Sequence, residues 1–129
     1  MADGLGIGSG AMVAFGHILV NQTIAAGASV VSEAVRIRDF ARNGNFSLGL
    51  YLTGAGGKID AQYLLSLDGT NYVVPSAATS IVSSFSTTSG TSGRDIISFC
   101  PEVAPFLKVR LVETAMVSTA TANAWLSVA

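Results

Sequence analysis

The chain has 129 residues, of which 50% are hydrophobic and only 12% are charged, and its net charge at pH 7 is −1. A nucleic-acid-binding protein is expected to have a positively charged surface, which a net charge of −1 does not provide. No apolar run approaches the roughly 18–20 residues that a membrane-spanning helix needs. We therefore predict one domain with neither a nucleic-acid partner nor a membrane partner. The single cysteine, Cys100, excludes an internal disulfide and a cysteine-based zinc site, and we expect it to be a small buried residue.

The N-terminal segment is glycine-rich, and we predict that it forms an arm. Residues 1–11 contain four glycines at alternate positions, and such a segment loses much conformational entropy when it becomes ordered. Packing against a neighbouring subunit would hold it in place, and docking on its own domain is the alternative. We assign the arm to residues 1–20 and a β-sandwich domain to residues 21–129. Asp3 stands where a signal peptide would be positively charged, so we expect synthesis in the cytoplasm.

Apolar residues at alternate positions predict strands in the first half of the domain. In residues 45–53 the inward side chains would be Phe46, Leu48, Leu50 and Leu52, and the outward ones Asn45, Ser47, Gly49 and Tyr51. In residues 28–39 we expect Val31, Val35 and Ile37 on one face and Ser32, Arg36 and Arg38 on the other. A helix is the alternative for residues 30–44, but their β-branched content favours a strand. The next strand would bury Ile59, Ala61, Tyr63 and Leu65.

A tight hairpin is predicted at Asp68-Gly69. This dipeptide is typical of a type I′ turn, in which both central residues have positive φ, and residues 71–75 would form the returning strand. Residues 79–85 predict a weak strand, and the Ser- and Gly-rich residues 89–93 a loop.

Three further strands are predicted toward the C-terminus, at residues 94–99, 104–115 and 117–129. In the last of these, small and apolar residues alternate with Asn123, Trp125 and other larger side chains. Roughly seven or eight strands joined by Gly- and Ser-rich turns indicate an all-β fold, an antiparallel β-sandwich or jelly roll.

The low charge of a chain without a membrane span predicts assembly. Protein interfaces would cover the excess hydrophobic surface, and a monomer covered in Ser and Thr is the alternative. The candidate interface residues are Leu5, Ile7, Met12, Val13, Phe15, His17, Tyr72 and Trp125.

No combination of residues predicts an enzyme, a cofactor or a metal site. His17 is the only histidine, and its position before an apolar run is typical of a core or interface residue. No serine stands in a G-x-S-x-G turn, and the carboxylates lack the short-spaced pair suited to glycoside hydrolysis. The glycines of residues 4–10 lack the lysine of a phosphate-binding loop. Asp68, Thr70 and Asn71 provide too few ligands for a calcium loop.

Aromatic side chains suggest one alternative function, a carbohydrate-binding β-sandwich module. Tyr51, Tyr72 and Trp125 could form a platform for sugar rings, since Tyr51 and Trp125 are expected to point away from the Leu-rich faces. A terminal-strand tryptophan more often seals a sandwich or an interface, and we prefer that interpretation of Trp125.

Three segments resemble small β-sandwich virion proteins of tailed phages and prophages: "FSLGLYLTGAGGKIDAQYLLSLDGTNYVVP", "FCPEVAPFLKVRLVETA" and "TANAWLSV". In those proteins a strand of the type F-x-L-x-L precedes a strand ending S-x-D-G-x-x-[FY], and a late strand carries a Trp-Leu pair. The similarity covers residues 45–128, about two-thirds of the chain.

The resemblance implies a structural protein of the virion, made in the host cytoplasm. Its most specific form would be a head decoration (cement) protein, and a tail-associated subunit is the other form. Decoration proteins often assemble as trimers, so the resemblance implies a homo-oligomer that contacts a major capsid protein or another virion protein. Such proteins act through surfaces, so the resemblance transfers no functional residue to this chain.

Overall fold

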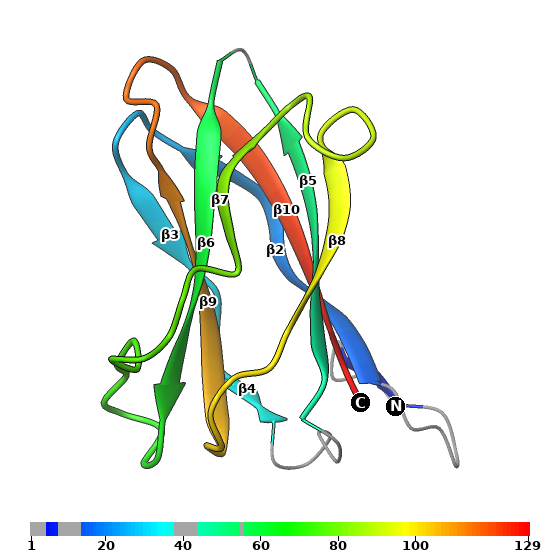
Figure 1. The fold of residues 1–129 in the computed structure, drawn as a ribbon, viewed down its shortest axis with the longest axis vertical. Coiled ribbons are helices and arrows are strands. Elements are labelled where there is room, and N and C mark those ends of the chain that lie inside the picture. Colours follow the sequence, from blue (N-terminus) through cyan, green and yellow to red (C-terminus); the bar gives the residue numbers. More distant parts are fainter. Residues whose placement is uncertain (1–4, 8–13, 38–43, 55) are drawn as a thin grey trace.

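The computed structural model describes residues 5–7, 14–37, 44–54 and 56–129, which form two antiparallel sheets packed face to face. Figure 1 shows the two layers from the side, with β3, β6, β7 and β9 in one and β2, β5, β8 and β10 in the other. The all-β antiparallel sandwich predicted from the sequence is therefore confirmed. Within the described ranges, no helix is long and apolar enough to cross a membrane.

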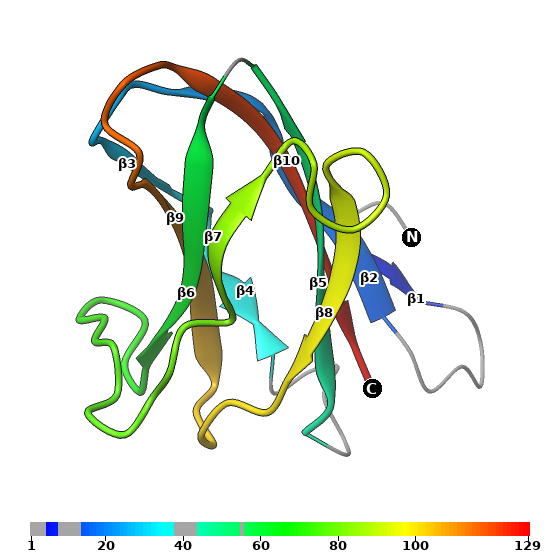
Figure 2. The same ribbon diagram turned by 45° about the horizontal axis from the view of Figure 1, so that its top comes forward.

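Each sheet has five strands, and Figure 2 shows short β1 at the edge of the first sheet. The first sheet has the order β1-β2-β10-β5-β8, with bounds Leu5–Ile7, Ala14–Ile24, Ala120–Val128, Phe46–Thr53 and Arg94–Phe99. The second has the order β3-β9-β6-β7, with bounds Ser29–Val31, Phe106–Glu113, Lys58–Ser66 and Val82–Ser86; β4 (Val35–Arg36) also pairs with β9. Seven of these strands have five or more residues, and β1, β3 and β4 have two or three.

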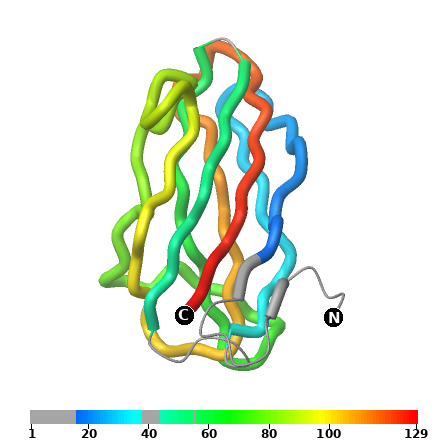
Figure 3. Tube along the Cα trace, turned by 90° about the vertical axis from the view of Figure 1, so that its right-hand side faces the viewer, coloured from blue at the N-terminus to red at the C-terminus, as the bar shows by residue number. Residues whose placement is uncertain are grey.

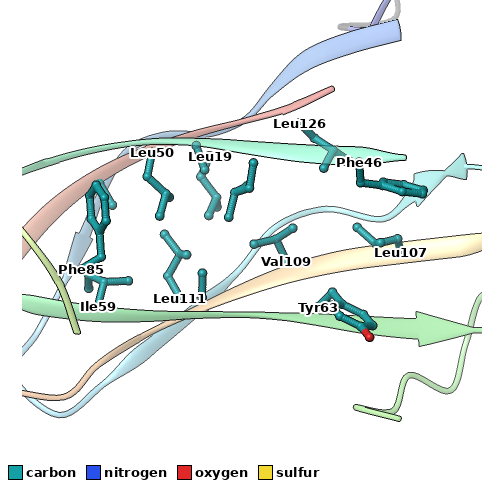
Figure 4. Close-up of a cluster of buried hydrophobic side chains, with 14 of the residues drawn as sticks. Leu19, Phe46, Leu50, Ile59, Tyr63, Phe85, Leu107, Val109, Leu111 and Leu126 are labelled. Carbon is teal, nitrogen blue, oxygen red and sulfur yellow. The ribbon is translucent and has the colours of Figure 1, made fainter. Parts of the chain in front are cut away.

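The core lies between the sheets, and the period of two in the sequence explains it. Alternate residues of β5, β6, β9 and β10 are buried, as predicted, and side chains from the two sheets meet in the middle (Figure 4). Leu48, Leu107, Leu111 and Leu126 are completely buried. Because a strand places successive side chains on opposite faces, the remaining residues of these strands form the two outer faces of the sandwich.

The strand predicted over residues 28–39 is broken in the middle. Val31 is 45% exposed and Ser32 is buried, which reverses the predicted faces at these two positions. The Ser32 hydroxyl accepts a hydrogen bond of 2.9 Å from the backbone N–H of Val109, and the Ser32 N–H donates one of 2.8 Å to the Val109 carbonyl. The serine side chain thus replaces a backbone partner of β9, and this ends β3 before β4 begins.

The turn after β6 is not a two-residue type I′ hairpin. Gly69 has φ of 77°, but the φ of Asp68 is not positive. The Asp68 carboxylate instead accepts hydrogen bonds from the backbone N–H groups of Thr70 and Asn71, at 2.9 and 2.8 Å. The returning chain pairs with β6 only at an isolated bridge between Leu65 and Val73. Asp68 therefore organises a wider loop through its side chain, as aspartates in Asx turns do.

Hydrogen bonds to the Asp68 carboxylate hold its pKa well below the usual range. The largest contributions come from the N–H groups of Asn71 and Thr70, followed by the side chains of Asn71 and Ser66. The acidic tip of this loop is thus charged because the loop stabilises the charge. Its oxygens accept hydrogen bonds from Ser66, Thr70 and Asn71 of the same loop, so the carboxylate holds the loop together.

Gly69→Ala is expected to lower the free energy of unfolding by about 1–2 kcal/mol, because Gly69 lies in the left-handed region. An added Cβ would also lie 3.3 Å from the Phe106 ring. Denaturant unfolding of the variant measures the effect, with Gly44→Ala as control. Gly44 also has positive φ (72°), but no atom lies within 4 Å of its added Cβ. Equal losses in the two variants would show that the contact with Phe106 adds nothing.

The segment predicted to be an N-terminal arm contributes β1 and the first part of β2 to the first sheet, so the predicted boundary between residues 20 and 21 falls inside β2. β1 pairs with β2 in the register Leu5 with Gly16 and Ile7 with Ala14. Residues 14–20 belong to β2, which pairs along β10. Residues 1–4 and 8–13 lie outside the described part of the chain, and Met12 and Val13 are among them.

Candidate interaction surfaces

The outer face of the first sheet carries a row of side chains centred on Trp125. In the register of the strands, Trp125 of β10 lies between His17 of β2 and Gly49 of β5, and Gly49 is followed by Ile96 of β8. Figure 3 looks onto this sheet and shows these four strands side by side. The rings of His17 and Trp125 are stacked, with centroids 4.5 Å apart and planes inclined by 14°.

A local irregularity in β2 supports this stack. The β2–β10 register shifts around Ala124, and Asn21 has φ of 46°, a conformation that asparagine tolerates. The Asn123 side chain accepts a hydrogen bond of 3.0 Å from the Asn21 N–H, and its amide donates one of 3.1 Å to the Asn21 side chain. Asn123 also lies 3.1 Å from the His17 ring nitrogen Nε2. One side chain therefore fixes both the bulge and the imidazole.

A groove of about 580 Å³ runs beside Trp125 on this face. Gly49 is one of the residues that line this groove. It has no side chain, whereas its register partners, Trp125 of β10 and Ile96 of β8, have large ones. An added Cβ at Gly49 would lie 3.7 Å from the Trp125 side chain. The groove is lined by Ser47, Gly49, Leu50, Thr91, Arg94, Asp95, Ile96, Trp125 and Ser127.

Tyr51 and Arg94 form the next row of the same face. They are partners in the β5–β8 register, and the Arg94 guanidinium carbon lies 3.8 Å from the centroid of the Tyr51 ring. The cation thus covers this face of the tyrosine. Tyr51 points away from the core, as predicted, but the Arg94 guanidinium covers one face of its ring.

Exposed apolar side chains gather at one end of the sandwich, which we call the apolar end: Leu67, Val73, Val74 and Val103. Leu67 is 79% exposed and Val103 is fully exposed. Leu67, Val73 and Val103 line a depression of about 400 Å³ together with Leu65, Ser66, Asp68, Asn71 and Ala104. The loops that carry these residues, after β6 and after β8, lie at the lower end of the molecule in Figure 1.

Tyr72 lies in the loop after β6, against Lys108 of the second sheet, so the three-residue aromatic platform does not form. The Nζ atom of Lys108, from β9, lies 4.4 Å from the centroid of the Tyr72 ring. The Tyr72 hydroxyl is buried and has no hydrogen-bond partner among the described residues. Burial, with a smaller effect of the nearby Asp68 charge, raises the pKa of Tyr72. Only Tyr51 and Trp125 of the proposed platform share a face.

Glu113 is a buried carboxylate, with 1% of its surface exposed, and all its contacts are structural. It accepts backbone hydrogen bonds from Gly27 at 3.0 Å, Lys58 at 3.0 Å, Ala115 at 3.0 Å and Met116 at 2.7 Å. These bonds, that of Lys58 foremost, lower the pKa of Glu113 to about 2. The charge joins three segments at the end of the sandwich opposite the apolar end.

The structure brings only some of the other predicted site residues together. His17 and Trp125 are brought together, and Leu5, Ile7 and Phe15 lie in the paired strands β1 and β2. Cys100 is exposed, so its predicted burial is wrong; it follows the last residue of β8, where the alternation stops. In the described part of the chain, no group of three His, Cys, Asp or Glu residues is placed to hold a metal ion.

Sequence reasoning missed Gly49, Leu67 and Val103 as surface determinants. A signal existed for Gly49, because a glycine inside a strand often marks a place where another group approaches closely. No such signal existed for Val103, since a valine in a loop is compatible with burial or exposure. No protein-family model and no curated protein matches this chain.

Proposed function

We propose that this chain is a non-enzymatic structural subunit that binds other protein surfaces in a larger assembly. Its most specific form is a capsid decoration (cement) protein of a tailed phage, as the sequence resemblance implies, with a tail-associated subunit as the other form. The apolar end is the observation that carries the proposal, because Leu67, Val73 and Val103 border one depression and are largely exposed. Clustered apolar side chains of this kind mark protein interfaces.

The free energy gained by burying the side chains of the apolar end is small for a single contact and favours a contact that is repeated in an assembly. Burying one exposed valine or leucine contributes about 1.5–3 kcal/mol, whereas association of two proteins costs about 4–15 kcal/mol in lost freedom. A single contact through these three side chains is therefore weak. A closed homo-oligomer such as a trimer, or a capsid lattice, repeats the contact and gains from multivalency.

The proposed partners are other copies of this chain and a major capsid protein or another virion protein. The chain's low charge supports this choice, since the centre of a protein interface is depleted in charged residues. The virion is accordingly its proposed location.

Val103→Asp is expected to abolish self-association, because it places a carboxylate in the apolar contact. Light scattering after size-exclusion chromatography should give the native protein a multiple of its 13.2 kDa mass and the variant 13.2 kDa. Val31→Asp is the matched control, because Val31 is an exposed valine of β3 away from the apolar end, and it should keep the native mass. A native protein that is monomeric at high micromolar concentration, or a Val103→Asp variant of native mass, would contradict the proposal.

A further inference from the structure

We propose that the groove beside Trp125 binds a pyranose ring of a neutral glycan. This inference does not rest on the proposed assembly function, because the groove lies on the outer face of the first sheet and shares no lining residue with the apolar end. Its volume of about 580 Å³ lies within the range of small-molecule sites, which is roughly 300–1,000 Å³.

The groove presents one face of an immobilised tryptophan. β10 lies between β2 and β5 in the sheet. His17, on β2, is stacked against one face of the Trp125 ring, so the opposite face is directed toward β5 and the groove. The stack on His17 restricts rotation of the indole before any ligand arrives, and this reduces the entropy cost of binding.

The missing side chain at Gly49 creates the space for a ring. Trp125 and Ile96 are both register partners of Gly49, on its two sides. Their strands are therefore two strand spacings apart, about 9.5 Å, and only the glycine lies between them. The space above Gly49 therefore lies between the indole and the Ile96 side chain, which is 73% exposed, and this is where we place the sugar ring.

Polar groups flank this apolar slot on both sides along the strands. Ser47 and Ser127 are register partners in the row on one side. Arg94 and Asp95 line the groove on the other side. Stacking on Tyr51 occupies a face of the Arg94 guanidinium, and its N–H groups, which lie in the plane of the guanidinium, remain directed sideways. Hydroxyl and guanidinium groups around an aromatic face match the alternating C–H and O–H groups of a sugar ring.

The charge of the lining selects a neutral ligand. Arg94 and Asp95 are the two charged residues among those that line the groove, and their charges are opposite. The Arg94 guanidinium is stacked on Tyr51, and the Asp95 carboxylate accepts a hydrogen bond of 2.8 Å from the Ile96 N–H, so both charges already have partners within the protein. A neutral hydroxylated ring brings no charge of its own and can accept hydrogen bonds from the in-plane N–H groups of Arg94. We therefore assign the groove to neutral hexose or N-acetylhexosamine units.

The single tryptophan of the chain allows a direct test. Maltotetraose, cellotetraose, chitotetraose and a β-1,4-galactotetraose are titrated to about 10 mM, which detects dissociation constants in the millimolar range. We expect at least one of them to change the Trp125 fluorescence and to shift the amide resonances of Ser47, Gly49 and Arg94. A proline-rich peptide is titrated in parallel as the competing class of ligand.

Two substitutions at Gly49 fill the groove without removing any group that would contact the sugar. Gly49 lacks a positive φ, and an alanine Cβ would make only ordinary contacts with Trp125. Gly49→Ala should therefore weaken binding about threefold, and Gly49→Val, which fills more of the slot, at least about tenfold. Thr53→Val lies on the same strand and outside the groove lining, and should retain the native affinity within about twofold.

Three results would overturn the proposal. The first is the absence of any change with all four sugars. The second is sugar binding that both Gly49 variants retain, since the ring would then lie elsewhere. The third is perturbation of these resonances by the peptide and by none of the sugars, which would identify a peptide groove. Loss of self-association in the Val103→Asp variant has no bearing on these outcomes, so the two proposals fail separately.

Discussion

Leu111→Ala is expected to lower the free energy of unfolding by about 2–5 kcal/mol. Leu111 is completely buried, and in the register of β9 it lies between Ala61 of β6 and Val30 of β3. Removing its side chain beyond Cβ leaves a cavity that the two strands on either side cannot close, because each is held in place by its own hydrogen bonds. Domains of this size have about 5–15 kcal/mol of stability in total, so the loss is a large fraction.

Urea or guanidinium unfolding measures the change, and Leu111→Met is the matched control. Methionine has nearly the same volume and should cost less than about 1.5 kcal/mol. Similar losses in the two variants would contradict the assignment of Leu111 to a closely packed core. They would show that any change at this position, and not the cavity, lowers stability.

Glu113→Gln is the second substitution with a large expected effect at neutral pH. Glutamine keeps one oxygen and replaces the other with a donor, so two of the four backbone N–H groups that face Glu113 lose their acceptor. These groups belong to three segments, near Gly27, Lys58 and Met116, so their packing should loosen together. We expect the melting temperature to fall by more than about 10 °C.

The pH dependence of this effect follows from the lowered pKa. The pKa of Glu113 falls from its ordinary 4.5 to about 2 in the folded protein. A carboxyl with a lowered folded pKa contributes stability that is fully present above its unfolded pKa and is lost as the pH falls through its folded pKa. The native protein should therefore lose stability between about pH 4.5 and pH 2, and the difference between native protein and Glu113→Gln should shrink over the same interval.

Denaturant unfolding at a series of pH values checks this expectation. Glu33→Gln, which changes an exposed glutamate, should follow the native curve. Part of the acid sensitivity will remain in Glu113→Gln, because hydrogen bonds in the loop after β6 also lower the pKa of Asp68. A difference between native protein and Glu113→Gln that stays constant from pH 7 to about pH 2 would contradict the role given to the charge.

Most of the sandwich could be predicted from the sequence because its long strands alternate strictly. β5, β6, β9 and β10 bury every second residue, and each such pattern is local. The irregular parts could not be predicted in this way. Ser32 is buried because its hydroxyl meets the Val109 N–H, a contact 77 residues away in the sequence. Asp68 was expected to adopt positive φ, whereas its carboxylate builds the loop.

The candidate surfaces were predictable only in part. The alternation of residues 117–129 predicts that Trp125 faces outward, but its stack on His17 depends on pairing between β2 and β10, which are about a hundred residues apart. The groove depends on three strands placing Trp125, Gly49 and Ile96 in one row. The apolar end joins two loops whose composition predicts no burial or exposure. Local patterns predict faces of strands, whereas surfaces arise from the register between them.

The composition of particles assembled in cells that encode this chain tests the central claim most directly. Particles are purified by gradient sedimentation, their proteins are quantified by mass spectrometry, and the particles are imaged by electron microscopy. The proposed function predicts that the chain sediments with the particles in many copies and occupies regular positions on their surface. A chain found only in the soluble fraction, while intact particles lack it, would contradict the claim that it is a structural subunit of the virion.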